Sequence, residues 1–375
     1  MKFVVDKKIP FIHGILEKHA DVVYLEGREI SRRDLLDADA LIIRTRTKCT
    51  RELLEGTRVR FIASATIGFD HIDTTFCDAK KIIWTNAPGC NSASVQQYIA
   101  ASLVHLSEKL NLTLAGMTIG IVGVGNVGSK VTKLCREFGM HVLLNDPPRE
   151  RKEGRQDFVS LETIIGKSDI ITLHVPLNRE GIDETFHMGN EAFFSRLKSG
   201  QILINSSRGE VLDTEALNAC LREKKLAACI LDVWEHEPEI DRELLGLVDI
   251  GTPHIAGYSA DGKANGTTMS IQALSRFFGL GLDSWAPSSV PLPVQPQMEL
   301  DCAGLSRQDI FGRLVRHTYD LLADDRRLRE SPQTFEKQRG DYPLRREFPA
   351  YAVKLRYASE ESRTLTKNLG FTVIE

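Results

Sequence analysis

Residues 120–130 read GIVGVGNVGSK, in which Gly123, Gly125 and Gly128 have the spacing G-x-G-x-x-G. An apolar run typical of a buried strand precedes the glycines, a helical pattern follows them, and the next apolar run, HVLLND, ends in Asp146. Glycines let the backbone approach a pyrophosphate, a helix N-terminus offers N–H groups to it, and the acid can accept hydrogen bonds from ribose hydroxyls. The context predicts a dinucleotide site made of Gly123, Gly125, Asn126, Val127, Gly128 and Asp146.

The carboxylate of Asp146 indicates which dinucleotide is preferred. A 2'-phosphate at this place would be repelled by Asp146, so the sequence favours NAD over NADP. Arg149 and Arg151 follow closely along the chain and leave NADP open. The structural alternative, a glycine-rich turn that serves helix–strand packing alone, is less favoured because strand, helix and acid all occur together.

The composition is that of an ordinary globular protein of more than one domain. The chain has 375 residues, of which 42% are hydrophobic and 26% are charged. A net charge of -3 does not favour a nucleic acid or membrane partner. No apolar run approaches the roughly 20 residues of a membrane helix. Seven scattered cysteines without C-x-x-C, and ten histidines without ligand spacing, predict reduced thiols in a cytoplasmic protein and no metal site.

Short apolar runs alternate with helical patterns along most of the chain. The runs expected to be strands are KFVVD, ALIIRTR, RFIASAT, KIIWTNA, TIGIVGVG, HVLLND, DIITLHVPL, QILINSS, AACILDVW and VDIGTPHIAG. This alternation predicts the α/β class, with parallel sheets covered by helices on both faces. Residues 286–297 are proline-rich and predict a linker. Beyond them a helical pattern, then a strand–helix–strand pattern, predicts a small α+β domain.

Ligands of open parallel sheets bind outside the carboxyl ends of the strands. The predicted strand ends carry the segments NSSRGEVLDTEAL, LDVWEHEPE and GTPHIAGYS. The guanidinium of Arg208 can hold a carboxylate and polarise the neighbouring oxygen. The imidazole of His254 can take a hydroxyl proton near neutral pH. Taken singly, an arginine here is more often a surface ion pair and a histidine is more often structural. Three further histidines are interpreted as structural or peripheral: His71, His174 and His236.

The three segments together resemble the D-2-hydroxyacid dehydrogenase family. The family pattern is N-x-x-R-G, then D-V-x-x-x-E-P, then T-P-H-x-A, and the order is the same here; Leu212 stands where the family more often has Val or Ile. The resemblance covers residues 1 to about 285. It implies NAD-dependent oxidation of a 2-hydroxy acid, with Arg208, Glu237 and His254 as catalytic residues and Glu237 as the partner of the imidazole. It also implies NAD contacts from Asp146, Val175, Ser206, Ser207, Arg208, Asp232 and Gly257.

The resemblance also implies a domain order that accounts for the late position of the glycine motif. The NAD domain is inserted in a substrate domain, both are expected to be doubly wound Rossmann-like or flavodoxin-like domains, and the cleft between them is expected to close on the substrate. The predicted parts are a substrate domain (1–95), an NAD-binding domain (96–264), a return to the substrate domain (265–285), and a linker with a C-terminal dimerisation domain (286–375).

Two segments of the first domain are candidates for substrate binding. If IIRTRTK stays extended, Arg44, Arg46 and Lys48 fall on one face, which suits a phosphate. Ordinary charge at a solvated strand end is the alternative. In ASATIGFDHID, the backbone N–H groups of a turn at residues 66–68 could bind a carboxylate.

The tail, together with HIAGYSADGKANGTT, resembles one branch of the family over the whole chain. That branch oxidises a phosphorylated 2-hydroxy acid in vitamin B6 (pyridoxal 5'-phosphate) synthesis and forms homodimers through its C-terminal domain. The resemblance implies substrate contacts from Thr45, Thr66 and Tyr258, and we expect Arg345 and Arg346 to reach the cleft of the partner subunit. The alternatives are a family member that acts on 3-phosphoglycerate or on glyoxylate/hydroxypyruvate, and an NAD-sensing co-repressor that uses the same fold.

Overall fold

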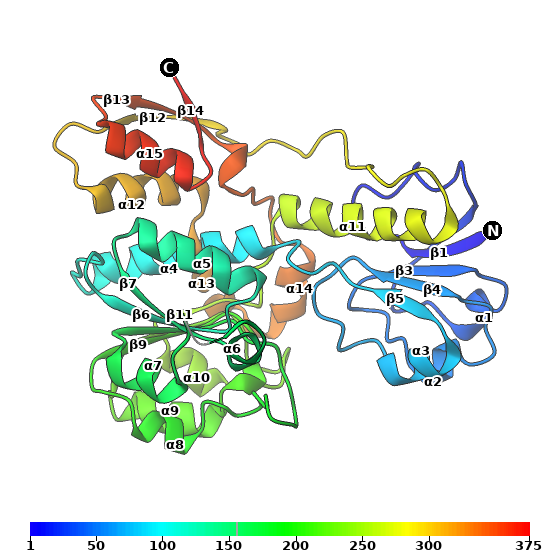
Figure 1. The fold of residues 1–375 in the computed structure, drawn as a ribbon, viewed down its shortest axis with the longest axis horizontal. Coiled ribbons are helices and arrows are strands. Elements are labelled where there is room, and N and C mark those ends of the chain that lie inside the picture. Colours follow the sequence, from blue (N-terminus) through cyan, green and yellow to red (C-terminus); the bar gives the residue numbers. More distant parts are fainter. Residues whose placement is uncertain (155–156) are drawn as a thin grey trace. The chain divides into compact units, whose positions relative to one another are not determined.

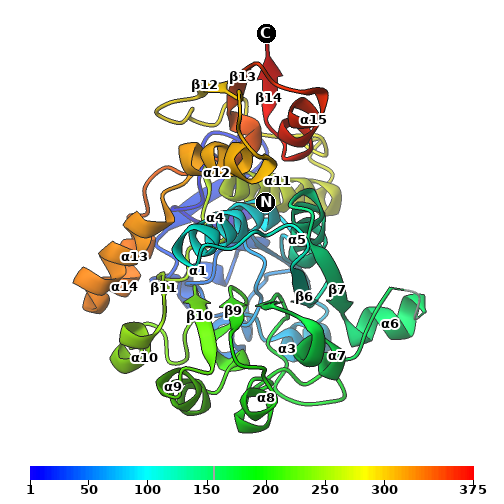
Figure 2. The same ribbon diagram turned by 90° about the vertical axis from the view of Figure 1, so that its left-hand side faces the viewer.

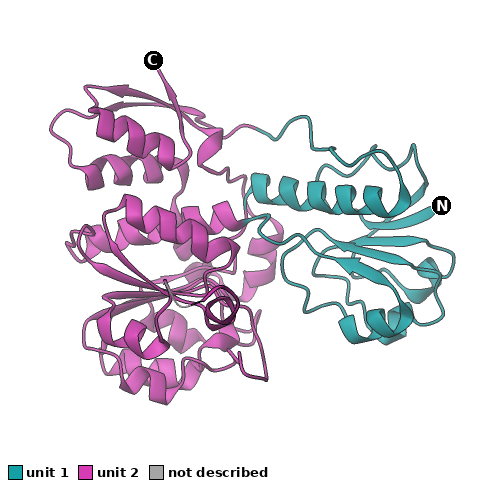
Figure 3. Cartoon of the chain, viewed as in Figure 1, with its two compact units in different colours: residues 1–91, 259–291 teal, residues 92–258, 292–375 magenta. Residues whose placement is uncertain are grey.

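The computed structural model describes residues 1–154 and 157–375. The chain forms two compact units (Figure 3). The first unit contains residues 1–91 and 259–291, and the second contains residues 92–258 and 292–375. The chain therefore passes from the first unit to the second after residue 91, returns to the first after residue 258, and passes to the second again after residue 291.

The first unit is built on a five-stranded parallel sheet in the order β2-β1-β3-β4-β5 (Figure 1). Its strands are β1 (Lys2–Asp6), β2 (Asp21–Leu25), β3 (Ala40–Ile43), β4 (Phe61–Ser64) and β5 (Ile83–Thr85). Because side chains alternate along a strand, Phe3 and Val5 face the helix α11 (Ala260–Phe278), whereas Val4 belongs to the opposite core. The helices on that opposite side are α1 (Arg32–Leu35), α2 (Arg51–Leu54) and α3 (Thr74–Lys80).

The chain turns directly after β3. The N–H of Thr47 donates to the carbonyl of Arg44 at 3.3 Å, and the hydroxyl of Thr47 is buried and donates to the carbonyl of Gly27 at 2.9 Å. The extended conformation on which a shared face of Arg44, Arg46 and Lys48 depended is therefore wrong beyond Ile43. The tight anchoring of Thr47 is the physical reason.

The second unit contains a six-stranded parallel sheet in the order β11-β10-β9-β8-β6-β7. Its strands are β6 (Thr118–Val122), β7 (His141–Asn145), β8 (Ile170–Leu173), β9 (Gln201–Asn205), β10 (Leu226–Leu231) and β11 (Ile250–Gly251). A parallel bridge from Phe158 to Leu144 adds one more rung outside β7. Strand β6 has β7 on one side and β8 on the other, so the chain reverses its direction of winding there. In such sheets this switch point is where a ligand binds.

Helices cover both faces of this sheet (Figures 1 and 2). Ile119 and Ile121 of β6 face a core shared with α4 (Ser92–Lys109) and α5 (Asn126–Glu137), and Val122 faces the other core. The helices of that other face are α7 (Leu161–Lys167), α8 (Glu191–Ser195), α9 (Thr214–Arg222) and α10 (Arg242–Leu247). The short helices α6 (Pro147–Glu153) and η1 (Gly209–Val211) follow β7 and β9.

The C-terminal segment of the second unit adds a small parallel sheet in the order β12-β13-β14. Its strands are β12 (Gln297–Asp301), β13 (Ala352–Arg356) and β14 (Thr372–Ile374). Its helices are α12 (Arg307–Thr318), α13 (Leu321–Glu330), η2 (Pro332–Thr334), α14 (Phe335–Gly340), η3 (Phe348–Ala350) and α15 (Glu360–Asn368). Phe311 and Val353 share a core with α4 and β6, which makes this segment part of the second unit.

The predicted α/β class with parallel sheets is confirmed, and so is a small C-terminal sheet. Strands β2 and β12 were not predicted. In the part of the chain that the structure describes, no helix combines the length and the apolar character needed to cross a membrane.

The glycines of residues 123–128 serve two different purposes. Gly123 has a φ of +87°, and a Cβ on it would meet the carbonyl oxygen of His174 at 2.6 Å. A Cβ on Gly128 would lie 2.0 Å from the carbonyl oxygen of Gly123. Gly125, in contrast, has no heavy atom within 4 Å of its Cβ position. Gly123 and Gly128 are thus required by packing, whereas Gly125 leaves space open in front of helix α5.

We therefore expect Gly128→Ala and Gly125→Ala to separate stability from ligand binding. Gly128→Ala should lower the free energy of unfolding by about 1–3 kcal/mol, because its methyl group meets backbone that must shift. Gly125→Ala should keep the melting temperature and weaken dinucleotide binding, since its methyl group fills the open space. Thermal melts with and without NAD measure both, and equal melting temperatures for the two variants would contradict the assignment.

Candidate active site

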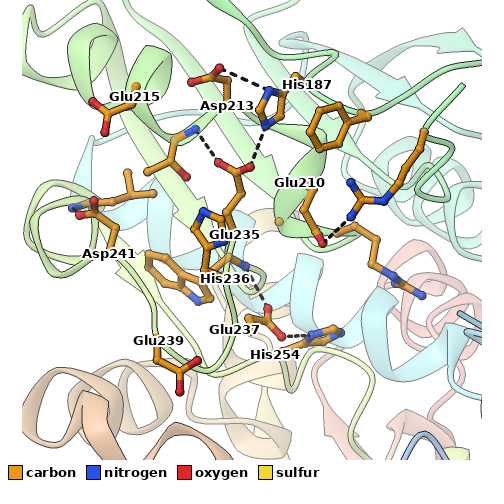
Figure 4. A pocket seen from close by; sticks show the side chains of 17 residues that line it. His187, Glu210, Asp213, Glu215, Glu235, His236, Glu237, Glu239, Asp241 and His254 are labelled. Carbon is orange, nitrogen blue, oxygen red and sulfur yellow. Dashed lines mark hydrogen bonds and ion pairs between the residues drawn. The ribbon is translucent and has the colours of Figure 1, made fainter. Parts of the chain in front are cut away.

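Three loops at the carboxyl ends of β9, β10 and β11 bring the candidate catalytic residues together. Arg208 follows β9, Glu237 lies in the loop after β10, and His254 follows β11. All three side chains line one cavity of about 780 Å³ in the second unit (Figure 4). The cavity exists because parallel strands end at one edge of the sheet and their loops surround the same space.

Glu237 and His254 form a hydrogen-bonded pair in this cavity (Figure 4). One carboxylate oxygen of Glu237 lies 2.8 Å from Nδ1 of His254, and the other accepts the N–H of Trp234 at 2.9 Å. Burial acts to raise the pKa of Glu237, but His254, Arg339 and the Trp234 N–H outweigh it, so that its pKa lies below the usual value. A carboxylate is only an acceptor, so Nδ1 of His254 carries a proton and Nε2 is left as the base.

The side chain of Asn205 shapes the turn that carries Arg208. Its amide nitrogen donates to the carbonyl of Arg208 at 2.9 Å, and its oxygen accepts the N–H of Ser207 at 3.0 Å and the hydroxyl of Ser207 at 2.8 Å. Nη1 of Arg208 donates to the carbonyl of Ser207 at 2.8 Å. Residues 205–208 are thus linked by hydrogen bonds among themselves, which fixes the backbone position from which the side chain of Arg208 extends. Ser206 in this turn lies 3.5 Å from Nδ1 of His174.

Asp232, at the end of β10, holds the backbone of the loop that contains His254. Its carboxylate accepts the hydroxyl of Thr252 at 2.6 Å and the N–H groups of Ile255 and Ala256, both at 2.8 Å. Burial raises the pKa of Asp232 to about 6, against the opposing influence of His254 and of these hydrogen bonds. The side chain is 1% exposed. In this structure Asp232 therefore organises the loop, whatever contact it makes with a cofactor.

A second histidine–carboxylate group lies in the same cavity (Figure 4). Nε2 of His187 is 2.7 Å from Glu235, Nδ1 of His187 is 3.4 Å from Asp213, and Glu235 also accepts the N–H of Thr214 at 2.9 Å. No spacing pattern in the sequence singles out His187 or Glu235, and neither was predicted. His236, which was interpreted as peripheral, lines the cavity as well.

The predicted dinucleotide residues gather at the carboxyl end of β6. The Cβ position of Gly123 is 2.9 Å from the N–H nitrogen of Val175, and helix α5 begins at Asn126. The carboxylate of Asp146 accepts the N–H of Val124 at 2.8 Å and the N–H of Arg149 at 3.1 Å. The open space before α5 and the adjacent carboxylate fit a pyrophosphate and a ribose.

His174, interpreted as structural or peripheral, is partly buried next to these residues. Its Nε2 lies 3.0 Å from the hydroxyl of Thr172, and burial lowers its pKa to about 3. The ring is therefore neutral at physiological pH. Two further predicted residues lie in the loop after His254: Gly257 follows Ala256, and Tyr258 donates its N–H to the carbonyl of Ile255 at 2.8 Å.

The predicted substrate residues Arg44, Thr45, Arg46 and Thr66 belong to the first unit. Arg44 contacts the fully buried Asp6 through Nε at 3.1 Å and Nη2 at 3.4 Å. The hydroxyl of Thr66 lies 2.8 Å from that of Ser64, which in turn lies 3.1 Å from Nε2 of His71. Burial lowers the pKa of His71 to about 4, in spite of the nearby Asp70. Arg44 and Thr66 are thus each held by a buried side chain, that of Asp6 and that of Ser64.

The prediction that Arg345 reaches a partner subunit is wrong. Arg345 is 5% exposed and donates from Nη2 to the carbonyls of Ile255, at 3.2 Å, and Ala256, at 2.5 Å, in its own chain. Arg346 is also buried, and its carbonyl accepts the side-chain amide of Gln97 at 2.9 Å. The sequence could not show this for Arg345, because the carbonyls that its side chain meets belong to residues about 90 positions away.

Residues 1–154 and 157–375 contain no group of three or more His, Cys, Asp or Glu side chains arranged to hold a metal ion. The seven cysteines are buried thiols.

Comparison with known proteins identifies the family of the chain. The family model for the D-isomer specific 2-hydroxyacid dehydrogenase, NAD binding domain, matches residues 92–256. A second family, described as a domain of unknown function, matches residues 291–370. The erythronate-4-phosphate dehydrogenase of Bacteroides thetaiotaomicron is 52% identical over 94% of this chain and 99% of its own length. That of Escherichia coli (strain ATCC 8739) is 40% identical over 100% of this chain and 99% of its own.

Solved structures are similar over most of the chain. The D-lactate dehydrogenase of Aquifex aeolicus, complexed with NAD and lactic acid, has a TM-score of 0.63 at 28% identity and covers 76% of this chain and 97% of its own. The NAD+-bound 3-phosphoglycerate dehydrogenase of Entamoeba histolytica has a TM-score of 0.64 at 27% identity, covering 78% and 99%.

The chain belongs to the D-isomer specific 2-hydroxyacid dehydrogenase family, in the group of the erythronate-4-phosphate dehydrogenases. The predicted family, the predicted branch and the prediction of an oxidoreductase are thereby confirmed. The individual roles of the site residues remain predictions.

The Glu237–His254 pair makes a prediction about stability and pH. A carboxylate with a lowered pKa contributes stability above its ordinary pKa of 4.5 and loses it as the pH falls through its folded-state value. Glu237→Gln should therefore unfold more easily than the wild type at pH 7, by about 1–3 kcal/mol. The difference should shrink as the pH falls below 4.5.

Chemical denaturation of both proteins from pH 7 to pH 3.5 measures this difference. Asp232 is present in both proteins, so the contribution of its raised pKa to the pH dependence of unfolding cancels when the two free energies are subtracted. A gap between the two proteins that stays constant over the whole range would show that the carboxylate of Glu237 does not interact with His254.

Proposed function

We propose that the chain catalyses the NAD-dependent oxidation of 4-phospho-D-erythronate to (3R)-3-hydroxy-2-oxo-4-phosphooxybutanoate, in the synthesis of pyridoxal 5'-phosphate. The observation that carries the proposal is the convergence of Arg208 and the Glu237–His254 pair in one cavity. Relatives of at least 40% identity over almost the whole chain, named erythronate-4-phosphate dehydrogenases, support the choice of substrate.

The oxidation removes a hydride, which carries two electrons, from C2 of the substrate and a proton from the hydroxyl on C2. Arg208 binds the C1 carboxylate and polarises the C2 oxygen with its planar guanidinium. Nε2 of His254 takes the hydroxyl proton as the C2 carbonyl forms. Glu237 keeps the proton of the imidazole on Nδ1 and stabilises the imidazolium that results. NAD, when bound, supplies the acceptor for the hydride that leaves C2.

NAD is proposed over NADP because the groups around Asp146 are already paired. Arg149, which could have met a 2'-phosphate, contacts both oxygens of Glu153 at 2.8 and 2.7 Å. Arg151 is paired with Asp183. A 2'-phosphate would thus meet the charge of Asp146 without an unengaged guanidinium to compensate it.

The first unit is proposed to supply the contacts to the substrate phosphate and carboxylate. Arg44 is held by Asp6 and so presents its charge in a defined place, with Thr45 and Arg46 next to it in the turn. The turn at Thr66, braced by Ser64 and His71, is proposed to bind the carboxylate, and Tyr258 of the second unit to contact the substrate.

The C-terminal segment, residues 292–375, is proposed to form a homodimer interface of a cytoplasmic enzyme. The buried thiols of the seven cysteines are compatible with a reducing compartment. Strands β12 and β14 are the two edges of the small sheet, and an edge is a natural place for contact with a second copy. No nucleic acid or membrane partner is proposed.

The substrate assignment predicts that NADH forms faster with 4-phospho-D-erythronate than with 3-phosphoglycerate. We expect a ratio of kcat/KM of roughly 100 or more, since the site must match both chain length and the extra hydroxyl. Arg44→Ala should raise KM for 4-phosphoerythronate about 10- to 100-fold, because charge-assisted hydrogen bonds to phosphate are lost. Absorbance of NADH measures both.

Arg44→Ala also leaves the carboxylate of Asp6 buried without its guanidinium, so a control is needed. The double variant Arg44→Ala/Asp6→Asn should recover the melting temperature but not KM. A KM restored in the double variant would show that Arg44 serves stability alone. Faster turnover of 3-phosphoglycerate, or of glyoxylate or hydroxypyruvate in the reverse direction, would replace the proposed substrate. Binding of NAD with no turnover of any 2-hydroxy acid would favour an NAD-sensing co-repressor.

A further inference from the structure

Arg345 lies in the segment between α14 and η3 and is a buried cation outside the catalytic group. Its guanidinium donates from Nη2 to two successive carbonyls, those of Ile255 and Ala256, at 3.2 and 2.5 Å. These carbonyls belong to the two residues that directly follow His254. A residue of the C-terminal segment therefore contacts the loop of the candidate catalytic base.

The backbone of the same two residues is also bound by Asp232. The N–H groups of Ile255 and Ala256 both donate to its carboxylate, at 2.8 Å each. An anion thus binds the N–H groups and a cation binds the carbonyls of one short stretch of backbone. Charge-assisted hydrogen bonds are stronger than neutral ones, so the loop is clamped from two directions.

The guanidinium of Arg345 is itself held in place by aromatic rings. Its carbon lies 4.5 Å from the ring centre of Tyr319 and 5.7 Å from that of Tyr342. Both tyrosine hydroxyls donate to the carboxylate of Asp324, at 2.7 and 2.6 Å. Within the described residues, Nε and Nη1 of Arg345 have no hydrogen-bond partner, and cation–π contacts take that place.

The loop needs such support because His254 has an unfavourable backbone conformation. Its φ is +55°, in the left-handed region that residues with a side chain seldom adopt. Strained residues persist where the surrounding structure overdetermines them. His254 itself donates its N–H to the carbonyls of Asp232 and Thr252, and the bonds from Asp232 and Arg345 hold the two residues that follow it.

A second arginine of the same segment lies against this part of the site. The guanidinium of Arg339, in α14, is 5.7 Å from the ring centre of Tyr258 and is one of the charges that lower the pKa of Glu237, although burial of that carboxyl opposes them. Nη1 of Arg339 is 3.0 Å from Glu336. The C-terminal segment therefore contributes positive charge on the side of Glu237 as well as on the side of the His254 loop.

We infer that Arg345 is a positioning residue, which fixes the loop of His254 in its reactive conformation and makes the C-terminal segment part of the active site of its own subunit. The kinetic consequence rests on the proposed function, whereas the structural consequence does not. Dimerisation is then not the only role of residues 292–375.

The kinetic test compares Arg345→Ala and Arg345→Lys with the control Tyr319→Phe. Tyr319→Phe keeps the ring against the guanidinium and loses one buried hydroxyl, so it perturbs the same core without touching the loop. We expect kcat of Arg345→Ala to fall about 10- to 100-fold, as small misplacements of a catalytic group do, while its NAD affinity is retained. Arg345→Lys should recover part of kcat, and Tyr319→Phe should keep it.

Chemical rescue distinguishes a positioning role from a general loss of stability. Millimolar guanidinium chloride should restore part of the kcat of Arg345→Ala, because the cation can occupy the vacated place, and equimolar urea should not. His254→Ala should show no such rescue. Rescue that is absent in Arg345→Ala while the protein remains folded and binds NAD would overturn the inference.

Hydrogen exchange tests the loop without any reference to the substrate. In Arg345→Ala, amides of the segment from Thr252 to Tyr258 should exchange faster than in the wild type and in Tyr319→Phe, whereas β6 and β9 should be unchanged. Unchanged exchange in this segment overturns the inference. If the wild type shows no turnover of 4-phosphoerythronate but the segment loosens in Arg345→Ala, the proposed function fails and the positioning role stands.

Discussion

The hydrogen bond between Glu237 and Nδ1 of His254 is the interaction on which the site depends. It joins the loop after β10 to the loop after β11, and it determines which nitrogen of the imidazole can accept a proton. Neighbouring groups hold the two partners of this hydrogen bond in place. The Trp234 N–H orients the carboxylate, and Asp232 holds the backbone that follows the histidine. A parallel sheet makes the arrangement possible because all its strands end at one edge.

Three buried or partly buried charged groups described above are paired with backbone or with a partner. Asp232 has three hydrogen bonds, Asp6 has Arg44, and Arg345 has two carbonyls and two aromatic rings. Each such group limits how a loop can move. In the first unit the buried carboxylate of Asp6 holds Arg44, and in the second unit Asp232 and Arg345 hold the loop of His254. Arg44 and the loop of His254 are thus held in place by contacts within the chain itself.

The sequence predicts the site better than it predicts the supports of the site. The glycine spacing, Asp146, Arg208 and His254 could be predicted because each stands at or just after a predicted strand end, and Glu237 because it lies in a motif of the resembling family. The end of β3 at Ile43 could not, because it depends on where Thr47 is buried. The role of Arg345 could not either, since its partner Ala256 lies 89 residues away and the contact is with a carbonyl that every residue possesses. A contact with a backbone carbonyl does not require any particular residue type at that position, so the sequence alone does not reveal it.

The most direct measurement of the central claim is the fate of the hydrogen on C2 of the substrate. With 4-phosphoerythronate deuterated at C2, the account predicts that the deuterium is recovered in NADH and that the reaction is slowed by the label, while the hydroxyl proton is released to water. Mass spectrometry of the NADH decides between the outcomes. Unlabelled NADH, with deuterium lost to the solvent, would contradict hydride transfer from C2 and with it the roles of Arg208, Glu237 and His254.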